Sequence, residues 1–572
     1  MKEKQILVFS HLGIKRKKDY FDKVMCGFWC LSNLIDTKKS IKSIKVVSHP
    51  WSKPHKLKTD HKEINEIVNK IFLQLYKKLN QIHHERLSER SWKIMLLPWL
   101  KCFYTIIFER KLLIDEAIKN YNISEILLLD KTHETPPKNT REFTLSASQD
   151  VEWHEAFTKN IVEILYPNLF IKTFKKKSEL NKNKNKIMVN IKELIVYVYG
   201  FFLRKQKYVF HITGTRFFNH LNIYLKLVSF PYLFLPKKFK VKQHDNFKLR
   251  NNLNIDLSNK ILKSLINKML SKYLPRSFLE DYEYYKLKAD SFFPKNPKKI
   301  ITYTGYYNDD LFKIYVANSL KNTSYEVFQH GGGFGVLPVH DEEKMIEETA
   351  DTFHTWGWEK HKQKKKLRYS PIGSFHLKNI FIKSSKNKLN IVCPLTEWSL
   401  LNFKMLSGYN SYGQLFYLET IMNGVKMFPS EILNHFKFRL QNSTKGWNIK
   451  KRLIQNDLEK NILETKGNFR NDLKFAKFCF ITTNSSTLME ALYSDIPTVV
   501  YLDPNYFPIR EDAKLFYKEL YDAEILFYNI NLAIGKIISV YENPNLWWYK
   551  KNVSLAKDKF ITNFAKSASD YY

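Results

Sequence analysis

A histidine followed by closely spaced glycines is the first feature of this sequence that could do chemistry. The segment QHGGGFG at 329–335 comes directly after the apolar run YEVF, which has the pattern of a buried strand. An imidazole at a strand end can act as a general base or contact a phosphate, and glycines let the backbone approach a ligand closely. We therefore expect His330 to be catalytic, and Gly331 and Gly332 to lie against a bound phosphate. The alternative is a flexible turn that carries a structural histidine.

A second candidate is a cluster of hydroxyl side chains at a predicted helix start. The segment TTNSST at 482–487 follows the apolar run FCFI and leads into the amphipathic stretch LMEALYSD. Free amides and the positive end of the helix dipole bind phosphate at such a position. We expect Ser485, Ser486 and Thr487 to hold the phosphate of a nucleotide, with Glu490 one turn further along. An ordinary helix cap is the alternative.

Aromatic and basic residues on neighbouring loops could complete such a site. Trp356 and Trp358 in FHTWGW could place ring faces against a sugar, or they could pack beneath a linker between domains. Arg439 and Arg510 could hold a phosphate or carboxylate through the guanidinium fork, or form surface salt bridges. The acidic run HDEE at 340–343 could bring carboxylates near the His330 loop; the alternative, which we expect, is a solvated acidic patch.

The elements that must position these residues alternate between short apolar strands and helical stretches. Helical spacing of apolar residues extends through 60–120. This alternation predicts an α/β fold with parallel sheets, in which ligands bind at the carboxyl ends of the strands. The expected strands are QILVFS at 5–10, EILLLD at 125–130, KIITY at 299–303, YEVFQ at 325–329, TFHTW at 352–356, LNIVC at 389–393, FKFRL at 436–440, FCFIT at 478–482 and PTVVY at 497–501.

Two Rossmann-like domains that face a central cleft are the expected organisation. The polar segment KSSKNK at 383–388 marks a boundary, and the length of 572 residues exceeds one ordinary core. The N-terminal domain is expected at 1–382, with a helical and basic insertion at about 170–295. That insertion contains the linker-like KKKSELNKNKNK at 175–186. The C-terminal domain is expected at 383–572.

Charge and composition limit the kinds of molecule that this protein is expected to bind. Lys and Arg number 93 against 56 Asp and Glu, a formal net charge of +37 that attracts polyanions. Lys and Asn are abundant throughout, as an AT-rich genome would produce, so compositional drift accounts for part of this excess. We expect peripheral association with an anionic inner membrane. No nucleic-acid-binding module is recognisable, so no specific nucleic acid partner is expected.

Cysteine usage and the apolar runs predict the compartment. The five cysteines form no CxxC pair, so buried free thiols in a reducing environment are expected. The first residues lack the apolar core of a signal peptide. The apolar runs at 194–203 and 94–108 are too short or too interrupted for a bilayer span, which needs about 20 apolar residues. A cytoplasmic protein, at most peripheral on the inner membrane face, is therefore expected.

Several motifs together resemble a family of bacterial transferases found in gene clusters for O-antigen and other surface polysaccharides. More distantly, the chain is similar to GT-B glycosyltransferases that use CMP- or CDP-activated donors, such as bacterial sialyltransferases, capsule Kdo transferases and teichoic-acid glycerophosphotransferases. The matching segments are KVVSHPWSK at 45–53, LNQIH at 79–83, SWKIMLLPWL at 91–100, FQHGGGFG at 328–335, FHTWGWE at 353–359 and the stretch from TTNSST to FYKEL at 482–520.

The resemblance implies a GT-B-like glycosyltransferase of surface-polysaccharide synthesis that needs no cofactor. Its donor would be a nucleotide sugar, first of all a CMP-linked nonulosonic acid, and its acceptor a glycan or lipid-linked glycan. His330 would be the catalytic acid or base, and Ser485, Ser486 and Thr487 would hold the donor phosphate. No DxD motif or His/Cys cluster suggests a metal, so no metal is expected. A CDP-polyol phosphotransferase, a basic nucleic-acid-binding protein and a non-catalytic scaffold are the alternatives.

Overall fold

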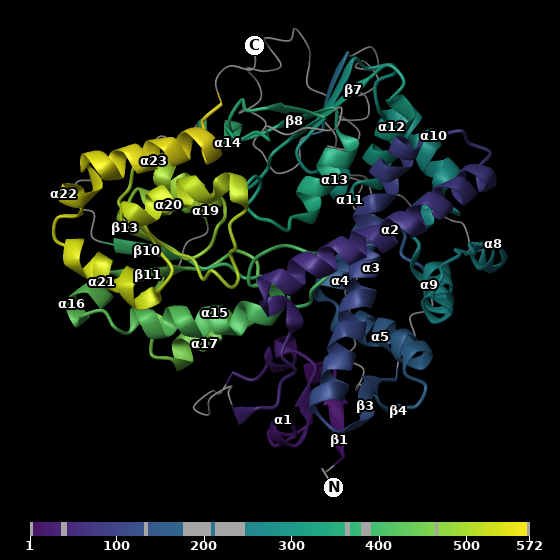
Figure 1. Cartoon of the computed structure of the whole chain (residues 1–572), viewed down its shortest axis with the longest axis horizontal. Coiled ribbons are helices and arrows are strands. Elements are labelled where there is room, and N and C mark those ends of the chain that lie inside the picture. The colour runs from purple at the N-terminus through teal and green to yellow at the C-terminus, as the bar shows by residue number, and fades with distance from the viewer. Residues whose placement is uncertain are drawn as a thin grey trace, which may run out of the picture.

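Three separate parallel sheets organise the protein. The computed structural model describes residues 4–35, 43–130, 135–175, 207–211, 246–360, 367–378, 390–463 and 467–568. Figure 1 shows the first sheet at the N-terminal end of the molecule, the second near the C-terminal residues, and the third among the helices of the C-terminal half. The prediction of an α/β fold with parallel sheets is confirmed.

The first sheet has the order β2-β1-β3-β4 and is supported by two long helices. Its strands are β1 (Gln5–Val8), β2 (Val24–Met25), β3 (Ile123–Leu129) and β4 (Phe170–Phe174). Helices α2 (Pro54–Ile82) and α3 (Glu89–Asn120) connect β2 to β3 and pack side by side (Figure 1). Ser88 caps α3 by accepting a hydrogen bond from the Ser91 amide. Because α3 is buried on most sides, it forms a central support for the fold.

The second sheet carries its strands in chain order, β5-β6-β7-β8-β9. They are β5 (Tyr208–His211), β6 (Lys299–Thr302), β7 (Ser324–Phe328), β8 (Thr352–His354) and β9 (Arg368–Ser370). Short helices follow the strands: α11 (Gly305–Asn308), α12 (Asp310–Ser319), α13 (Asp341–Thr349) and α14 (Phe375–Lys378). The loop between β7 and α13 contains the glycine-rich segment.

The third sheet has the order β12-β11-β10-β13-β14-β15. The strands are β10 (Asn390–Pro394), β11 (Phe436–Arg439), β12 (Ile462–Leu463), β13 (Ala476–Ile481), β14 (Thr498–Tyr501) and β15 (Leu526–Phe527). Its main helices are α15 (Asn410–Val425), α17 (Ile449–Gln455), α18 (Phe469–Leu473), α19 (Ser486–Tyr493), α20 (Lys514–Asp522), α21 (Ile530–Val540), α22 (Pro544–Trp548) and α23 (Lys551–Phe564). Residues after α23 return to the second sheet, where Ser567 bridges to Ser374.

All nine expected strands are present, with bounds that shift by at most two residues. The helical prediction for 60–120 is confirmed as α2 and α3, with a break at 83–88. The predicted boundary at 383–388 and most of the segment at 175–186 lie outside the described residues. The expected insertion at 170–295 contributes β4, β5 and three helices, α8 (Phe247–Asn251), α9 (Lys260–Tyr273) and α10 (Tyr282–Phe292).

The N-terminal region, which was predicted as one Rossmann-like domain at 1–382, contains two sheets among its described residues. No hydrogen-bonded pair of described strands joins these two sheets. Strand periodicity shows that a segment is extended and buried, but it does not show which strands pair. The long helices α2 and α3 separate the first strands from those of the second sheet. This separation is a tertiary property that the sequence pattern does not contain.

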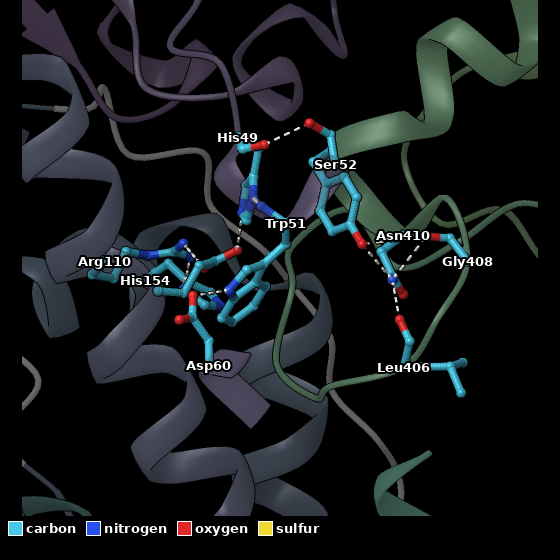
Figure 2. Close-up of polar contacts among 11 residues, drawn as sticks. His49, Trp51, Ser52, Asp60, Arg110, His154, Leu406, Gly408 and Asn410 are labelled. Atoms are coloured by element: carbon cyan, nitrogen blue, oxygen red, sulfur yellow. Dashed lines mark hydrogen bonds and ion pairs between the residues drawn. The ribbon is translucent and has the colours of Figure 1, made fainter. Parts of the chain in front are cut away.

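A buried polar network fixes the first sheet to the third (Figure 2). His49 stacks on Tyr412 of α15 with ring centroids 4.5 Å apart, and its Nε2 lies 3.1 Å from Glu109 Oε1. The Trp51 indole donates to Asp60 Oδ2 across 2.8 Å. On the other side, Asn410 donates to the carbonyls of residues 406 and 408. These contacts give the KVVSHPWSK segment a structural role between the first and third sheets.

Two further expectations concern the cysteines and the membrane. All five cysteines are free and buried, as the sequence predicted. Among the described helices, none is long and apolar enough to cross a lipid bilayer.

Candidate functional site

The glycine segment after β7 packs directly against the start of α19. The Gly332 amide donates to Ser486 Oγ across 3.1 Å. A Cβ added at Gly332 would lie 2.5 Å from the carbonyl carbon of Ser485, so no side chain fits there without movement. Gly335 has a φ of +76°, and a side chain there would overlap the Trp358 ring. The two motifs singled out in the sequence therefore meet, one from the second sheet and one from the third.

A chain of hydroxyl groups covers the carboxyl ends of β10 and β13. The Thr483 hydroxyl lies 3.2 Å from that of Thr396 and 3.1 Å from that of Ser485. The Ser485 hydroxyl lies 2.9 Å from that of Thr487. Because Ser485 caps α19 without a side-chain hydrogen bond to its amides, the first amides of the helix keep their donor capacity. Residues Ser485 to Thr487 are partly exposed, so these groups can meet a ligand.

Asn484 adds an unpaired donor beside this helix start. Its side chain is 5% exposed, and its Oδ1 accepts a hydrogen bond of 3.0 Å from the Tyr517 hydroxyl. Its Nδ2 has no hydrogen-bond partner within the described ranges. Buried polar atoms in folded proteins are nearly always paired, so this donor is available to a ligand acceptor. Next to free helix amides, that acceptor would be an anion.

His330 and Glu342 form an imidazole–carboxylate pair at the other side of the glycine segment. His330 Nε2 lies 3.3 Å from Glu342 Oε2, and the side chain is 27% exposed. His330 Nδ1 is buried and has no hydrogen-bond partner in the part of the chain that the structure describes. Glu342 also accepts from the Tyr306 hydroxyl across 3.1 Å and from Lys404 Nζ across 2.8 Å. When Nε2 carries the ring proton and donates it in a hydrogen bond to Glu342, Nδ1 is the ring's acceptor nitrogen.

Within the acidic run at 340–343, Asp341 and Glu343 are buried and Glu342 is half-buried, so the expectation of a solvated patch is wrong. Asp341 is bound by His61 Nε2 at 3.0 Å and by the Met405 amide at 2.9 Å. Burial alone would raise the pKa of Glu342, but the Lys404 ammonium and the hydrogen bond with His330 hold that pKa well below the glutamate range. Glu342 is therefore an anion at neutral pH. The acidic sequence at 341–343 does not by itself show that each carboxylate has its own cationic partner in the folded protein.

Trp356 and Trp358 pack beneath the glycine segment. They are 3% and 4% exposed, and both indoles donate to Gln329, Trp356 to its carbonyl at 3.1 Å and Trp358 to its Oε1 at 2.8 Å. The structure thus gives them the packing role and presents neither ring face to a sugar. Through Gln329 they fix the residue that precedes His330.

The remaining predicted residues are bound within the protein. Glu490 Oε1 lies 2.6 Å from His376 Nε2, which links α19 to α14. Arg439 donates to Asp472 across 2.6 Å and lies at 9% exposure. Arg510 donates to Glu343 across 2.8 Å, with its guanidinium over the ring of Trp358. Each of these three side chains therefore has an ionic partner within the described part of the protein.

Three residues of this site were missed from the sequence: Glu342, Lys404 and Asn484. Glu342 lay within a run that was assigned to solvent, and Asn484 lay inside the hydroxyl motif without a role. Lys404 is 74 residues from His330 in the chain and carries no local signal. Across the described ranges, no group of three or more His, Cys, Asp or Glu side chains is arranged to hold a metal ion.

The fold and site define a parallel α/β protein in which a helix start with free donors meets an imidazole–carboxylate pair. The chain belongs to the LIC12162 family of transferases, whose family model matches residues 8–572. The prediction that this chain is a transferase is thereby confirmed. A search of curated protein sequences gives no match.

A solved structure with weak similarity is MurG from Acinetobacter baumannii. The two share 11% sequence identity, the alignment covers 49% of this chain and 73% of that chain, and the TM-score is 0.29.

Proposed function

We propose that this transferase is a metal-independent, GT-B-like glycosyltransferase of surface-polysaccharide synthesis. Its donor is a nucleotide-activated sugar, with a CMP-linked nonulosonic acid as the first candidate, and its acceptor is a glycan or lipid-linked glycan. The observation that carries the proposal is the contact between Gly332 and Ser486, because it brings a set of unpaired donors close to a histidine with a free ring nitrogen.

The donor phosphate binds at the start of α19 in this proposal. The free amides of Ser486 and Thr487, the Asn484 side-chain amide and the hydroxyl of Ser485 supply donors without a positive side chain. Gly332 lets the glycine loop approach the helix start closely, since an added Cβ would lie 2.5 Å from the Ser485 carbonyl carbon, whereas one at Gly331 would lie 3.5 Å from Ser486 Oγ. Such fixed donors stabilise the negative charge that develops on the leaving phosphate in the transition state.

The acceptor hydroxyl is activated by His330. The oxygen of the acceptor hydroxyl attacks the anomeric carbon of the donor sugar, and the hydroxyl proton passes to His330 Nδ1. The bond from the anomeric carbon to the phosphate oxygen breaks. Glu342 stays ionised and stabilises the imidazolium that forms. The net charge of +37 supports work at an anionic membrane surface, where a lipid-linked acceptor would be found.

Binding of a nucleotide panel tests the proposal. CMP, CDP, UDP and GDP are added separately to the full chain, and the thermal midpoint is measured, because a ligand of the folded state raises it by mass action. CMP is expected to give the largest rise, and CMP-sialic acid with an oligosaccharide acceptor is then expected to give a glycosylated product. A product that contains phosphorus from a CDP-polyol would favour the phosphotransferase instead. No rise with any nucleotide would reject the proposal.

A further inference from the structure

The segment between β10 and α15 reaches from the third sheet to the second. We call residues 395–409 the strap. Its first part lies on the hydroxyl chain, where the Thr396 hydroxyl is 3.2 Å from that of Thr483. Its second part pairs with the residues that precede α13: the Ser407 amide donates to the Val339 carbonyl across 2.9 Å, and Leu406 bridges to His340. The strap therefore touches both halves of the candidate site.

Further contacts hold the strap in one conformation. The Met405 amide donates to Asp341 Oδ2 across 2.9 Å, and the Asp341 amide donates to the Met405 carbonyl across 3.2 Å. At its end, Asn410 donates to the carbonyl of Leu406 across 2.7 Å (Figure 2). Lys404 lies between these fixed points, so the backbone defines where its side chain starts.

Lys404 meets Glu342 on the side away from His330. Its Nζ lies 2.8 Å from Glu342 Oε1, whereas His330 Nε2 lies 3.3 Å from Glu342 Oε2. The two oxygens of one carboxylate thus hold a lysine from the third sheet and a histidine from the second. The Lys404 stem also covers the ring of Tyr307, with Nζ 5.8 Å from its centroid.

The other groups around His330 leave this carboxylate as its main charged partner. Tyr306 donates its hydroxyl to the same carboxylate, and Phe334 packs against the imidazole edge with ring centroids 5.1 Å apart. His340 lies on the far side of Phe334, with its ring centroid 4.1 Å from that of Phe334. Asp341 is bound by His61 and lies 3.5 Å from Lys101.

We propose that Lys404 is a positioning residue that acts on His330 through Glu342: it shares this carboxylate with the ring and offsets part of its charge, so that the strap sets how readily the ring takes a proton. The functional meaning rests on the proposed role of His330 as the base. The physical effect does not, because it concerns the ring alone. Lys404 offsets part of the carboxylate charge, and its removal leaves that charge to the imidazolium.

A histidine titration in the full chain tests this inference. Histidine labelled with ¹³C at Cε1 is incorporated, the His330 signal is assigned from its loss in His330→Ala, and its titration midpoint is measured by NMR. In Lys404→Met, we expect the midpoint to rise by about one pH unit, because a cation near the ring is lost. In Glu342→Gln, which removes the anion, the midpoint is expected to fall.

Lys404→Arg is the matched control, since it keeps the charge, and its midpoint should stay within about 0.3 units of the wild type. A His330 midpoint that is unchanged or lower in Lys404→Met would overturn the inference. If Lys404→Met fails to fold, as judged by thermal melting, Lys404→Gln gives the same decision. If the midpoint follows Lys404 while His330→Ala keeps full transferase turnover, the proposed base role fails and the positioning inference stands.

Discussion

The amide of Gly332 donates to the hydroxyl of Ser486 across 3.1 Å, although 154 positions separate the two residues in the chain. This hydrogen bond joins the loop after β7 in the second sheet to the first turn of α19 in the third. Both loops leave the carboxyl ends of parallel strands, where ligands bind in folds of this kind. The predictions below test what this contact does.

Replacement of Gly332 by alanine should separate the two loops. The added Cβ would lie 2.5 Å from the Ser485 carbonyl carbon, so one backbone segment must move. We expect nucleotide affinity, measured by calorimetry, to fall about tenfold or more, which corresponds to about 1.4 kcal/mol. Gly331→Ala is the control, since its Cβ would lie 3.5 Å from Ser486 Oγ, an ordinary contact. Equal losses in both variants would contradict the close-approach argument.

Replacement of Asn484 by aspartate should repel the donor phosphate. The unpaired Nδ2 becomes a carboxylate oxygen, which removes a donor and adds a negative charge beside the helix start. We expect nucleotide affinity to fall by at least about tenfold. Tyr517→Phe is the control, because it removes only the hydrogen bond to Asn484 Oδ1. If Asn484→Asp binds nucleotide as well as the wild type, the phosphate does not lie next to this side chain.

Replacement of His330 by alanine should strongly lower turnover and leave nucleotide binding intact. General base catalysis contributes about 100- to 10,000-fold to a rate, so kcat should fall by a factor in this range. The nucleotide-induced rise in thermal midpoint should persist, because the phosphate donors belong to other residues. Turnover within a few-fold of the wild type would remove His330 from the base role.

Glu155 should make stability depend on pH. Burial at the carboxyl end of the first sheet raises the pKa of Glu155 to about 7, although Ser10 and the Leu129 amide donate to it. Because the folded state holds this proton more tightly than the unfolded state, the stabilisation is present at low pH and is lost as pH rises toward 7. The pKa shift corresponds to a decrease in the free energy of unfolding on the order of 3 kcal/mol between low pH and pH above 7.

The measurement for Glu155 is the thermal midpoint of the wild type relative to Glu155→Gln. That difference should decrease from about pH 5 to about pH 8, since the amide stays neutral throughout. Parallel curves for the two proteins would show that Glu155 does not titrate in this range.

The sequence alone determined the strand–helix alternation and the two segments that form the site. Apolar runs bounded by polar turns predicted β7 and β13, because a parallel strand that is buried on both faces has a nearly continuous apolar sequence. Unusual local composition at 329–335 and 482–487 predicted that both segments carry chemistry, and the structure brings them into contact.

Only the tertiary structure decided which side chains complete the site. Lys404 and Glu342 meet through a strap between two sheets, and no local spacing encodes that pairing. The same is true of Trp356 and Trp358, whose burial follows from the position of Gln329. Periodicity reports whether a residue faces a core, whereas partner choice depends on how separate sheets pack, and long-range packing leaves no fixed spacing in the chain.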